Sequence, residues 1–296
     1  MPPILLRPVR DTPEDAETVR LLAAAAFGDS HTLKGESPET PPDPERIARR
    51  HEKIRHFVRT DPAGSWLAED GSGQAVGVAQ SVIREGTWGL SLLVVLPAAQ
   101  GKGVGTALLS RALEYGRGCL RGIICSSRHP AAVRTYRRAG FEVHPTIRMR
   151  GVVDRTRLDP PDGAAVEGSA RDRDLMDSVD RRLRGGAHGP DHDYLLAHHR
   201  LVVADDLAGS AYCYVRDGGR VELLAATSRR MATRVLTSAL LGLSEGVTAE
   251  IWDVTAEQQW AVDVGIAAGL ELRAAGFVCY RGMRPPAPYI PSGAFL

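Results

Sequence analysis

The stretch Gln100-Gly101-Lys102-Gly103-Val104-Gly105 decides the fold of this chain. It follows an apolar run at residues 92–96 and precedes residues 106–113, whose apolar side chains have helical spacing. A strand that ends in a Gly-rich turn and opens a helix presents unpaired N–H groups and the positive end of the helix dipole. Because glycine has no Cβ, the main chain there can turn tightly and approach a diphosphate closely. The sequence therefore predicts that a phosphorylated cofactor binds near residue 100.

The spacing of the glycines excludes two common classes of nucleotide site. A P-loop requires G-x-x-x-x-G-K-[ST], which does not occur in the chain. A dinucleotide site requires Gly or Ala at the sixth position of its fingerprint, where this sequence has Thr106 or Leu108. The apolar run at residues 121–125 is followed by Ser126 and Ser127, not by the acidic residue of a dinucleotide site. The pattern that remains is Q-x-x-G-x-G.

This pattern resembles the acetyl-CoA pyrophosphate loop of the GNAT superfamily of N-acyltransferases, with Val95-Leu96-Pro97 before it at the usual spacing. Residues 129–141 resemble a later helix of the same family, in which Tyr136 and Gly140-Phe141 match and His129 replaces the usual Asn. The resemblance covers residues 60 to 150. The alternative is a Gly-rich turn between a strand and a helix that binds no ligand.

The resemblance implies roles for individual residues. The strand before the loop holds the pantetheine arm and polarises the thioester carbonyl through its main-chain amides, while Lys102 adds a charge to the loop that holds the pyrophosphate. Tyr136 reaches the sulfur as general acid, a role that suits a phenol because its pKa near 10 keeps it protonated at neutral pH. The alternative for Tyr136 is a tyrosine packed against the core. The cofactor-binding residues implied are Leu93, Val94, Val95, Gln100, Gly101, Lys102, Gly103, Val104, Gly105, Thr106, His129 and Tyr136.

A general base is harder to assign. The strand at residues 87–92 carries no carboxylate, and Glu85 just before it is the nearest candidate catalytic base. The alternative for Glu85 is an ordinary charged residue of a hairpin turn. His31, His51 and His56 lie in the segment that shapes the acceptor pocket in the family, so a neutral imidazole there is a further candidate.

The order of predicted elements repeats along the chain. Residues 221–226 mirror residues 90–96, and Gly276-Phe277 mirrors Gly140-Phe141 at a spacing of 136 residues. We predict an α/β fold of two tandem GNAT-like domains, each with a mixed, mostly antiparallel sheet flanked by helices. Their expected bounds are residues 1–152 for the catalytic domain, 153–163 for a linker and 164–296 for a degenerate copy with a Pro-rich tail.

The second copy has lost the glycines of the loop. Residues 228–234 read Ser-Arg-Arg-Met-Ala-Thr-Arg, so no residue there allows close approach of the main chain to a diphosphate. Arg229 and Arg230 are weaker candidates for holding an anion than for a solvated helix start. The sequence thus predicts one CoA site in each chain.

Two further segments contain residues that could carry chemistry. Residues 188–199 hold four histidines and two aspartates, but their spacing matches no zinc signature, so we expect no metal. The Pro-rich tail at residues 284–296 ends in apolar residues that could dock on a surface. In some tandem-domain aminoglycoside N-acetyltransferases that resemble this layout, the terminal carboxylate acts as base, although no matching motif is visible here.

Composition sets the remaining limits. With 296 residues, 43% hydrophobic and 25% charged, the chain is an ordinary globular protein, and its net charge of +1 indicates neither nucleic acid nor membrane as a partner. Lysine occurs only at three positions, which with the Ala, Gly and Pro content indicates a high-GC bacterial, actinobacterial source. Four scattered cysteines and the absence of a signal-like segment favour the cytoplasm.

The function predicted from these observations is transfer of an acetyl group from acetyl-CoA to a primary amine, most simply that of a small molecule, by direct attack on the thioester. The acceptor and the acyl-chain preference stay open, and a homodimer is compatible with the sequence. A CoA-binding sensor without turnover is the alternative, because the strand lacks a carboxylate and His129 departs from the family pattern.

Overall fold

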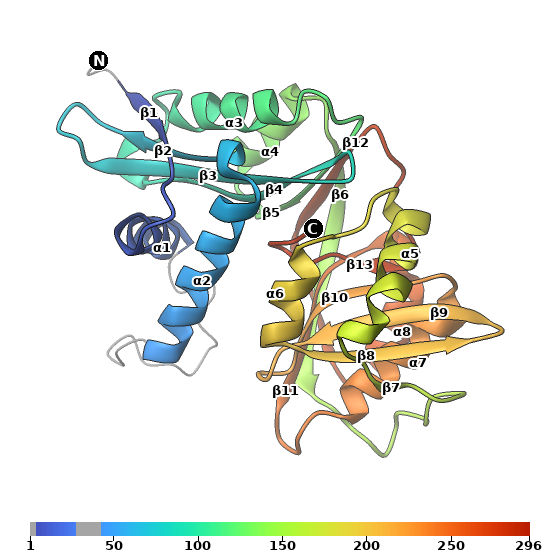
Figure 1. The fold of residues 1–296 in the computed structure, drawn as a ribbon. Helices are drawn as coiled ribbons and strands as arrows, with labels where there is room; N and C mark the ends of the chain where they lie inside the picture. The colour runs from blue at the N-terminus through green and yellow to red at the C-terminus, as the bar shows by residue number, and fades with distance from the viewer. Residues whose placement is uncertain (1–3, 28–42) are drawn as a thin grey trace. The chain divides into compact units, whose positions relative to one another are not determined.

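The computed structural model describes residues 4–27 and 43–296. The chain forms two compact units (Figure 1). The first consists of Met1–Ile83 with Leu90–Gly118, and the second of Arg84–Gly89 with Cys119–Leu296. Among the described residues no helix combines the length and apolar character needed to cross a bilayer.

The first unit is a small sheet with helices on both faces. Strand β1 (Leu5–Pro8) pairs antiparallel with β2 (Ser65–Glu69), and β2 pairs antiparallel with β3 (Ala75–Arg84), which is followed by β4 (Thr87–Val95). Helices α1 (Pro13–Phe27) and α2 (Pro44–Thr60) cover one face, while α3 (Val104–Tyr115) lies on the other (Figure 1). Short 3₁₀ helices, η2 (Pro62–Gly64) and η3 (Pro97–Ala99), precede β2 and α3.

Alternation along the strands separates the two faces of the first unit. Leu67, Val78 and Val94 face α1 and α2 and form a core with the apolar stripes of those helices. The neighbouring position, Gly77, faces the other way, where a Cβ would lie 3.0 Å from a methyl group of Leu108 on α3. Helix α3 therefore approaches the sheet closely at this glycine.

The second unit contains the rest of the chain. Its elements, in chain order, are β5 (Arg121–Ser126), α4 (Pro130–Arg138), β6 (Glu142–Val152), β7 (Val166–Glu167), η4 (Ala170–Asp172), α5 (Arg173–Arg184), α6 (Asp191–His198), β8 (Arg200–Asp206), β9 (Gly209–Val215), β10 (Arg220–Ala226), α7 (Arg229–Leu241), β11 (Thr248–Thr255), η5 (Ala256–Gln258), α8 (Gln259–Ala267), β12 (Glu271–Arg281) and β13 (Tyr289–Ile290). Helices α5 and α6 lie in front of strands β8 to β10, and α7 and α8 behind them (Figure 1).

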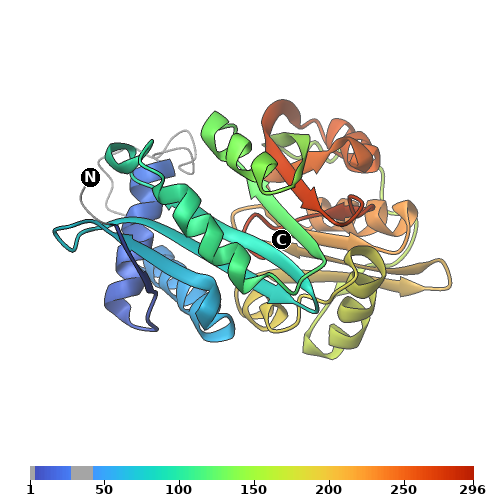
Figure 2. The same ribbon diagram turned by 90° about the horizontal axis from the view of Figure 1, so that it is seen from above.

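Strands β6 and β12 lie side by side in this unit (Figures 1 and 2). Strand β12 is inserted between β5 and β6, and β6 lies between β12 and β11, all of them antiparallel. The order continues from β11 through β10, β9 and β8 to β7, with only β10 and β11 parallel. The C-terminal tail adds β13 to β10.

The order of elements confirms the predicted tandem GNAT-like fold. After omission of the 3₁₀ helices, the series β-α-α-β-β-β-α-β-α-β from β1 to β6 repeats from β7 to β12. Strand β10 corresponds to β4, as expected from residues 221–226. Strand β6 of the first copy pairs with β11 of the second, and β12 of the second copy pairs with β5 of the first. Strand pairing therefore does not locate the boundary between the two copies. The predicted bounds 1–152, 153–163 and 164–296 stay a prediction.

The predicted match between Gly276-Phe277 and Gly140-Phe141 is wrong. Gly140 follows α4 with φ 84°, and its counterpart after α8 is Gly269, with φ 75°. Gly276 lies inside β12, where a Cβ would come within 1.9 Å of the carbonyl oxygen of Ser126 on β5. Gly276 therefore allows the close contact of two strands. The true counterpart of Tyr136 is Gly265, since the carbonyl oxygen of each accepts the N–H of the residue just before the next strand.

Candidate active site

The N-terminus of α3 is open. Gly101 and Gly103 have φ 75° and 80°, a left-handed conformation that favours glycine, and a Cβ at either would meet no atom within 4 Å. Gly103 is the N-cap and supplies no side-chain cap, so the first N–H groups of α3 keep no partner inside the helix. Gln100 ties the loop to β4 through Nε2, which donates to the carbonyl oxygen of Val95 at 3.0 Å. This arrangement suits an anion.

The side chain of Lys102 folds back onto the loop. Its Nζ donates to the carbonyl oxygen of Ala98 at 2.9 Å, and the bond is exposed. The ammonium group adds positive charge to the loop from this position.

The corresponding helix of the second copy is closed. Ser228 caps α7, because its Oγ accepts the N–H of Met231 at 3.3 Å. Arg230 forms an ion pair with Asp162 at 2.5 Å, so its charge is already matched. The contrast between the open end of α3 and the capped end of α7 supports a single CoA site in each chain.

Tyr136 lies on α4 in the second unit and is only 5% exposed. Its hydroxyl makes no hydrogen bond with any residue that the structure describes, and burial raises the pKa of the phenol. The group is therefore a protonated donor at neutral pH without a partner of its own, as a general acid requires. His129 is the exposed N-cap of α4 and makes no side-chain cap bond.

Glu85 forms an ion pair. Its carboxylate accepts three bonds from Arg181, the shortest at 2.6 Å, and a fourth from the main-chain N–H of Ala187 at 3.1 Å. The Arg181 hydrogen bonds lower the pKa of Glu85 to about 2. A carboxylate held ionised in this way is a weak proton acceptor, which favours the interpretation of Glu85 as a turn residue; its catalytic role stays a prediction.

Of the predicted acceptor-pocket histidines, His51 bonds to Glu17 at 2.7 Å, and the ring of His56 contacts that of Phe57. His31 lies outside the described residues. These contacts leave the acceptor-pocket role of the histidines a prediction.

Asp253 is a carboxylate that the sequence reasoning missed. It lies on β11 with φ 56°, beside a shift in register between Ile251 and Val254, and is only 9% exposed. Within the described part of the chain it makes no hydrogen bond and no ion pair, and burial raises its pKa to about 6, against the opposing charge of Arg220. The sequence offers little signal for it, because Asp253 is one of two acidic residues in this strand, the other being Glu250.

A chain of near neighbours connects Asp253 with the surroundings of Tyr136. Burial and then the charge of Asp253 raise the pKa of Cys125 on β5. Cys279 on the adjacent β12 raises the pKa of Cys125 and, after burial, that of Tyr136. Strained, buried and unpaired carboxylates occur preferentially at functional sites.

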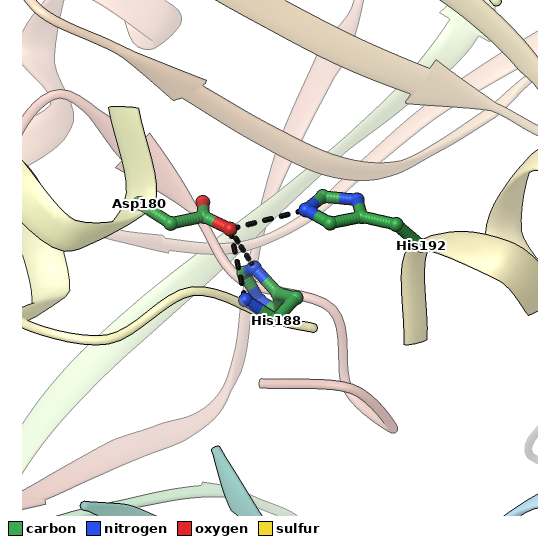
Figure 3. Close-up of side chains that lie close together, drawn as sticks. All are labelled: Asp180, His188 and His192. Atoms are coloured by element: carbon green, nitrogen blue, oxygen red, sulfur yellow. Dashed lines mark hydrogen bonds and ion pairs between the residues drawn. The ribbon is translucent and has the colours of Figure 1, made fainter. Parts of the chain in front are cut away.

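The histidine-rich segment divides into two parts. His188 and His192 meet Asp180 of α5 in a wholly buried cluster (Figure 3), whereas His198 packs against Tyr194 and His199 lies outside the cluster. The tail docks, as its apolar end suggested: Phe295 and Leu296 are buried, and the main-chain oxygen of Leu296 lies 2.8 Å from Nε2 of His188.

The fold and the open helix end resemble those of GNAT acyltransferases. Residues 30–141, less than half of the chain, match the model of the acetyltransferase (GNAT) family. Members of the family are acetyltransferases that generally use acetyl-CoA. No curated protein matches the chain.

Solved structures share the fold. A proposed acetyltransferase from Pyrococcus horikoshii has a TM-score of 0.75 at 18% identity, with 99% of this chain and 95% of that chain covered. A GCN5-related N-acetyltransferase from Sphaerobacter thermophilus has a TM-score of 0.57 at 16% identity, covering 96% and 98%. A tandem GNAT protein from the clavulanic acid biosynthesis pathway has a TM-score of 0.51 at 14% identity, covering 95% and 99%.

Proposed function

We propose that this protein is an acetyl-CoA-dependent N-acetyltransferase that acetylates a primary amine of a small molecule. The observation that carries the proposal is the uncapped N-terminus of α3, opened by two left-handed glycines within the segment that matches the family. Acetyl-CoA supplies the activated acetyl group as a thioester. The open amides, the helix dipole and Lys102 favour its diphosphate at this position.

The proposed roles follow from where charge develops during acetyl transfer. The amine nitrogen attacks the thioester carbon, the carbon–sulfur bond breaks, and the thiolate takes a proton. Main-chain amides of Leu93, Val94 and Val95 polarise the carbonyl. The Tyr136 hydroxyl, which has no competing partner among the described residues, gives its proton to the sulfur. The chemistry needs no metal at the reacting atoms.

Two carboxylates are candidates for removing the proton of the amine. Glu85, the candidate from the sequence, is held ionised by Arg181 with a pKa of about 2, which makes it a poor base. Asp253 has a pKa of about 6 and no partner among the described residues, so it is better matched to proton transfer near neutral pH. We favour Asp253.

The first test measures binding and turnover together. Isothermal titration with acetyl-CoA should give one equivalent per chain, and a panel of small amines should release CoA thiol. Tyr136→Phe should lower turnover by about 10²- to 10⁴-fold with little change in acetyl-CoA affinity. Two binding equivalents would contradict the single site, and unchanged turnover in the variant would remove Tyr136 from the mechanism.

The alternative is a CoA-binding sensor without turnover, which the neutralisation of Glu85 by Arg181 favours. Tight acetyl-CoA binding with no acetylated amine and no hydrolysis would support it. A third possibility keeps catalysis with a longer acyl group, which titration with longer acyl-CoAs would reveal. The net charge of +1 agrees with a small-molecule partner in preference to nucleic acid, and we place the enzyme in the cytoplasm, where a homodimer is compatible with the proposal.

A further inference from the structure

Three buried side chains converge in the second unit, from two helices and the loop between them. Asp180 of α5, His188 of the loop and His192 of α6 are each 0% exposed (Figure 3). Oδ2 of Asp180 lies 2.7 Å from Nδ1 of His188 and 3.2 Å from Nε2 of His192. One atom from each residue is thus within 4.8 Å of the others.

Each of these side chains is held from the outside by an oxygen atom. Nε2 of His188 faces the main-chain oxygen of Leu296 at 2.8 Å, and Nδ1 of His192 faces the hydroxyl of Tyr214 at 3.1 Å. The second oxygen of Asp180 accepts from the hydroxyl of Tyr212 at 2.5 Å. An outer oxygen that fixes the tautomer and the ring orientation is typical of histidines that bind a metal.

The protons of His188 cannot satisfy both of its neighbours when the ring is neutral. The Leu296 oxygen only accepts, so Nε2 must carry the hydrogen. Nδ1 then presents a lone pair to a carboxylate oxygen 2.7 Å away, which is repulsive. Either a second proton or a cation must lie between these two atoms.

A fourth side chain that could bind a metal lies beside the cluster. Asp177 precedes Asp180 by three residues on α5, so both side chains lie on one face of the helix. Its Oδ1 is buried, lies 3.7 Å from Nε2 of His192, and has no hydrogen-bond partner in the described part of the chain. The carboxylate forms long ion pairs with Arg173 at 3.4 Å and with Arg181 at 4.0 Å.

We propose that Asp177, Asp180, His188 and His192 bind one divalent metal ion, Zn²⁺ in the first instance. Nitrogen and carboxylate ligands in a four-coordinate set suit zinc. The site has a structural role, because three of its ligands are wholly buried and leave no open position for a substrate. The ion would link α5 to α6 and, through His188, to the docked tail. This inference does not rest on the proposed acetyl transfer.

The proposal replaces the expectation of no metal in this segment. That expectation rested on spacing within residues 188–199, whereas two of the ligands are carboxylates that lie on the preceding helix. His198 and His199, which made the segment look metal-rich, are not ligands.

The test is metal analysis of full-length protein made without a polyhistidine tag or chelator. Mass spectrometry of the metals should find about one zinc per chain. Chelation should lower the melting temperature, and added Zn²⁺ should restore it. Co²⁺ in place of Zn²⁺ should give the visible absorption of a four-coordinate site.

Variants separate a built site from adventitious zinc. Asp180→Asn should abolish stoichiometric zinc, and Asp177→Asn, whose side chain is 17% exposed and can be replaced with less damage, should weaken zinc affinity in a folded protein. Asp193→Asn, on α6 but 73% exposed, is the matched control and should keep the metal. Protein that carries no metal and is neither bound nor stabilised by Zn²⁺, Mn²⁺ or Co²⁺ after chelation would overturn the proposal and leave His188 as a doubly protonated ring.

Discussion

At the scale of single residues, two left-handed glycines allow the effect of backbone strain to be measured apart from the effect on ligand binding. Gly103 and Gly73 both have φ 80°, and a Cβ at either would meet nothing within 4 Å. An alanine at each position should therefore cost a similar strain of about 1–2 kcal/mol. Only Gly103 stands at the open helix end, so only Gly103→Ala places a methyl group beside the proposed diphosphate.

We expect Gly103→Ala to raise the dissociation constant for acetyl-CoA by about tenfold, which corresponds to roughly 1.4 kcal/mol. Titration calorimetry of both variants measures it, with Gly73→Ala as the control of equal strain. Equal affinities in the two variants would place the cofactor elsewhere.

Asp253 allows a pH-dependent prediction. Its folded pKa of about 6 lies above the ordinary 3.8, because burial disfavours the charged form more than Arg220 favours it. The neutral carboxyl is compatible with the fold, so the protein loses stability as the pH rises from about 4 through 6. At pH 7 to 8 the ionised group should cost the fold on the order of 2–3 kcal/mol.

Asp253→Asn should therefore raise the free energy of unfolding by about 2 kcal/mol near pH 8 and by much less at pH 4. Asparagine tolerates the left-handed backbone, so no new strain is expected. If Asp253 is the base, turnover should fall by about 10²- to 10⁴-fold in the same variant. Denaturant unfolding at several pH values measures the first effect, with the exposed Asp263→Asn as control. A loss of turnover in Glu85→Gln but not in Asp253→Asn would return the role to Glu85.

Sequence reasoning located some site residues and missed others for a physical reason. The glycine loop is a local pattern, because left-handed φ values and an uncapped helix are properties of consecutive residues. Asp253 and Asp180 acquire their character only from side chains distant in the sequence: burial by the curved sheet in one case, two histidines from the next loop and helix in the other. Such environments leave no pattern in a single chain.

At the scale of elements, the positions of helix starts and strands are explained by residues that are near one another in the sequence. The hydroxyl of Thr12 accepts the N–H of Asp15 at the start of α1, and Asp43 with Pro44 opens α2. The position of β12 between β5 and β6 was not predicted, because alternation of apolar residues identifies a strand but not its partner. The misplaced Gly276-Phe277 match had the same cause.

The capped helix α7 provides a test of the contrast between the two copies. Ser228→Ala removes the hydroxyl that accepts from Met231, and should lower the free energy of unfolding by about 1 kcal/mol. Acetyl-CoA should still bind at one equivalent with unchanged affinity, because this helix end holds no cofactor in our proposal. Chemical denaturation and calorimetry on the same samples measure both. Weaker acetyl-CoA binding in Ser228→Ala would place a ligand at the second copy.

At the scale of the whole molecule, the two copies of the repeat are joined by exchanged strands. Residues Phe277–Arg281 of β12 pair with β5, residues of β12 also pair with β6, and β6 pairs with β11. Each copy thus completes its sheet with the last strand of the other. The second unit is built from both copies, so a boundary drawn in sequence does not separate two independent folds.

We expect that residues 1–152 and 164–296, produced separately, do not fold, because each fragment would expose unpaired strand edges on both sides of the missing partner. Cleavage of the full chain at a protease site inserted in the exposed segment around Asp159 should instead leave the two halves associated and able to bind acetyl-CoA, since the exchanged strands remain paired. Circular dichroism and amide hydrogen exchange compare the separate fragments with the cleaved protein, and slow exchange in β6 and β12 should occur only in the latter. Cooperative unfolding and acetyl-CoA binding by fragment 1–152 alone would show that the exchange contributes nothing essential to the fold.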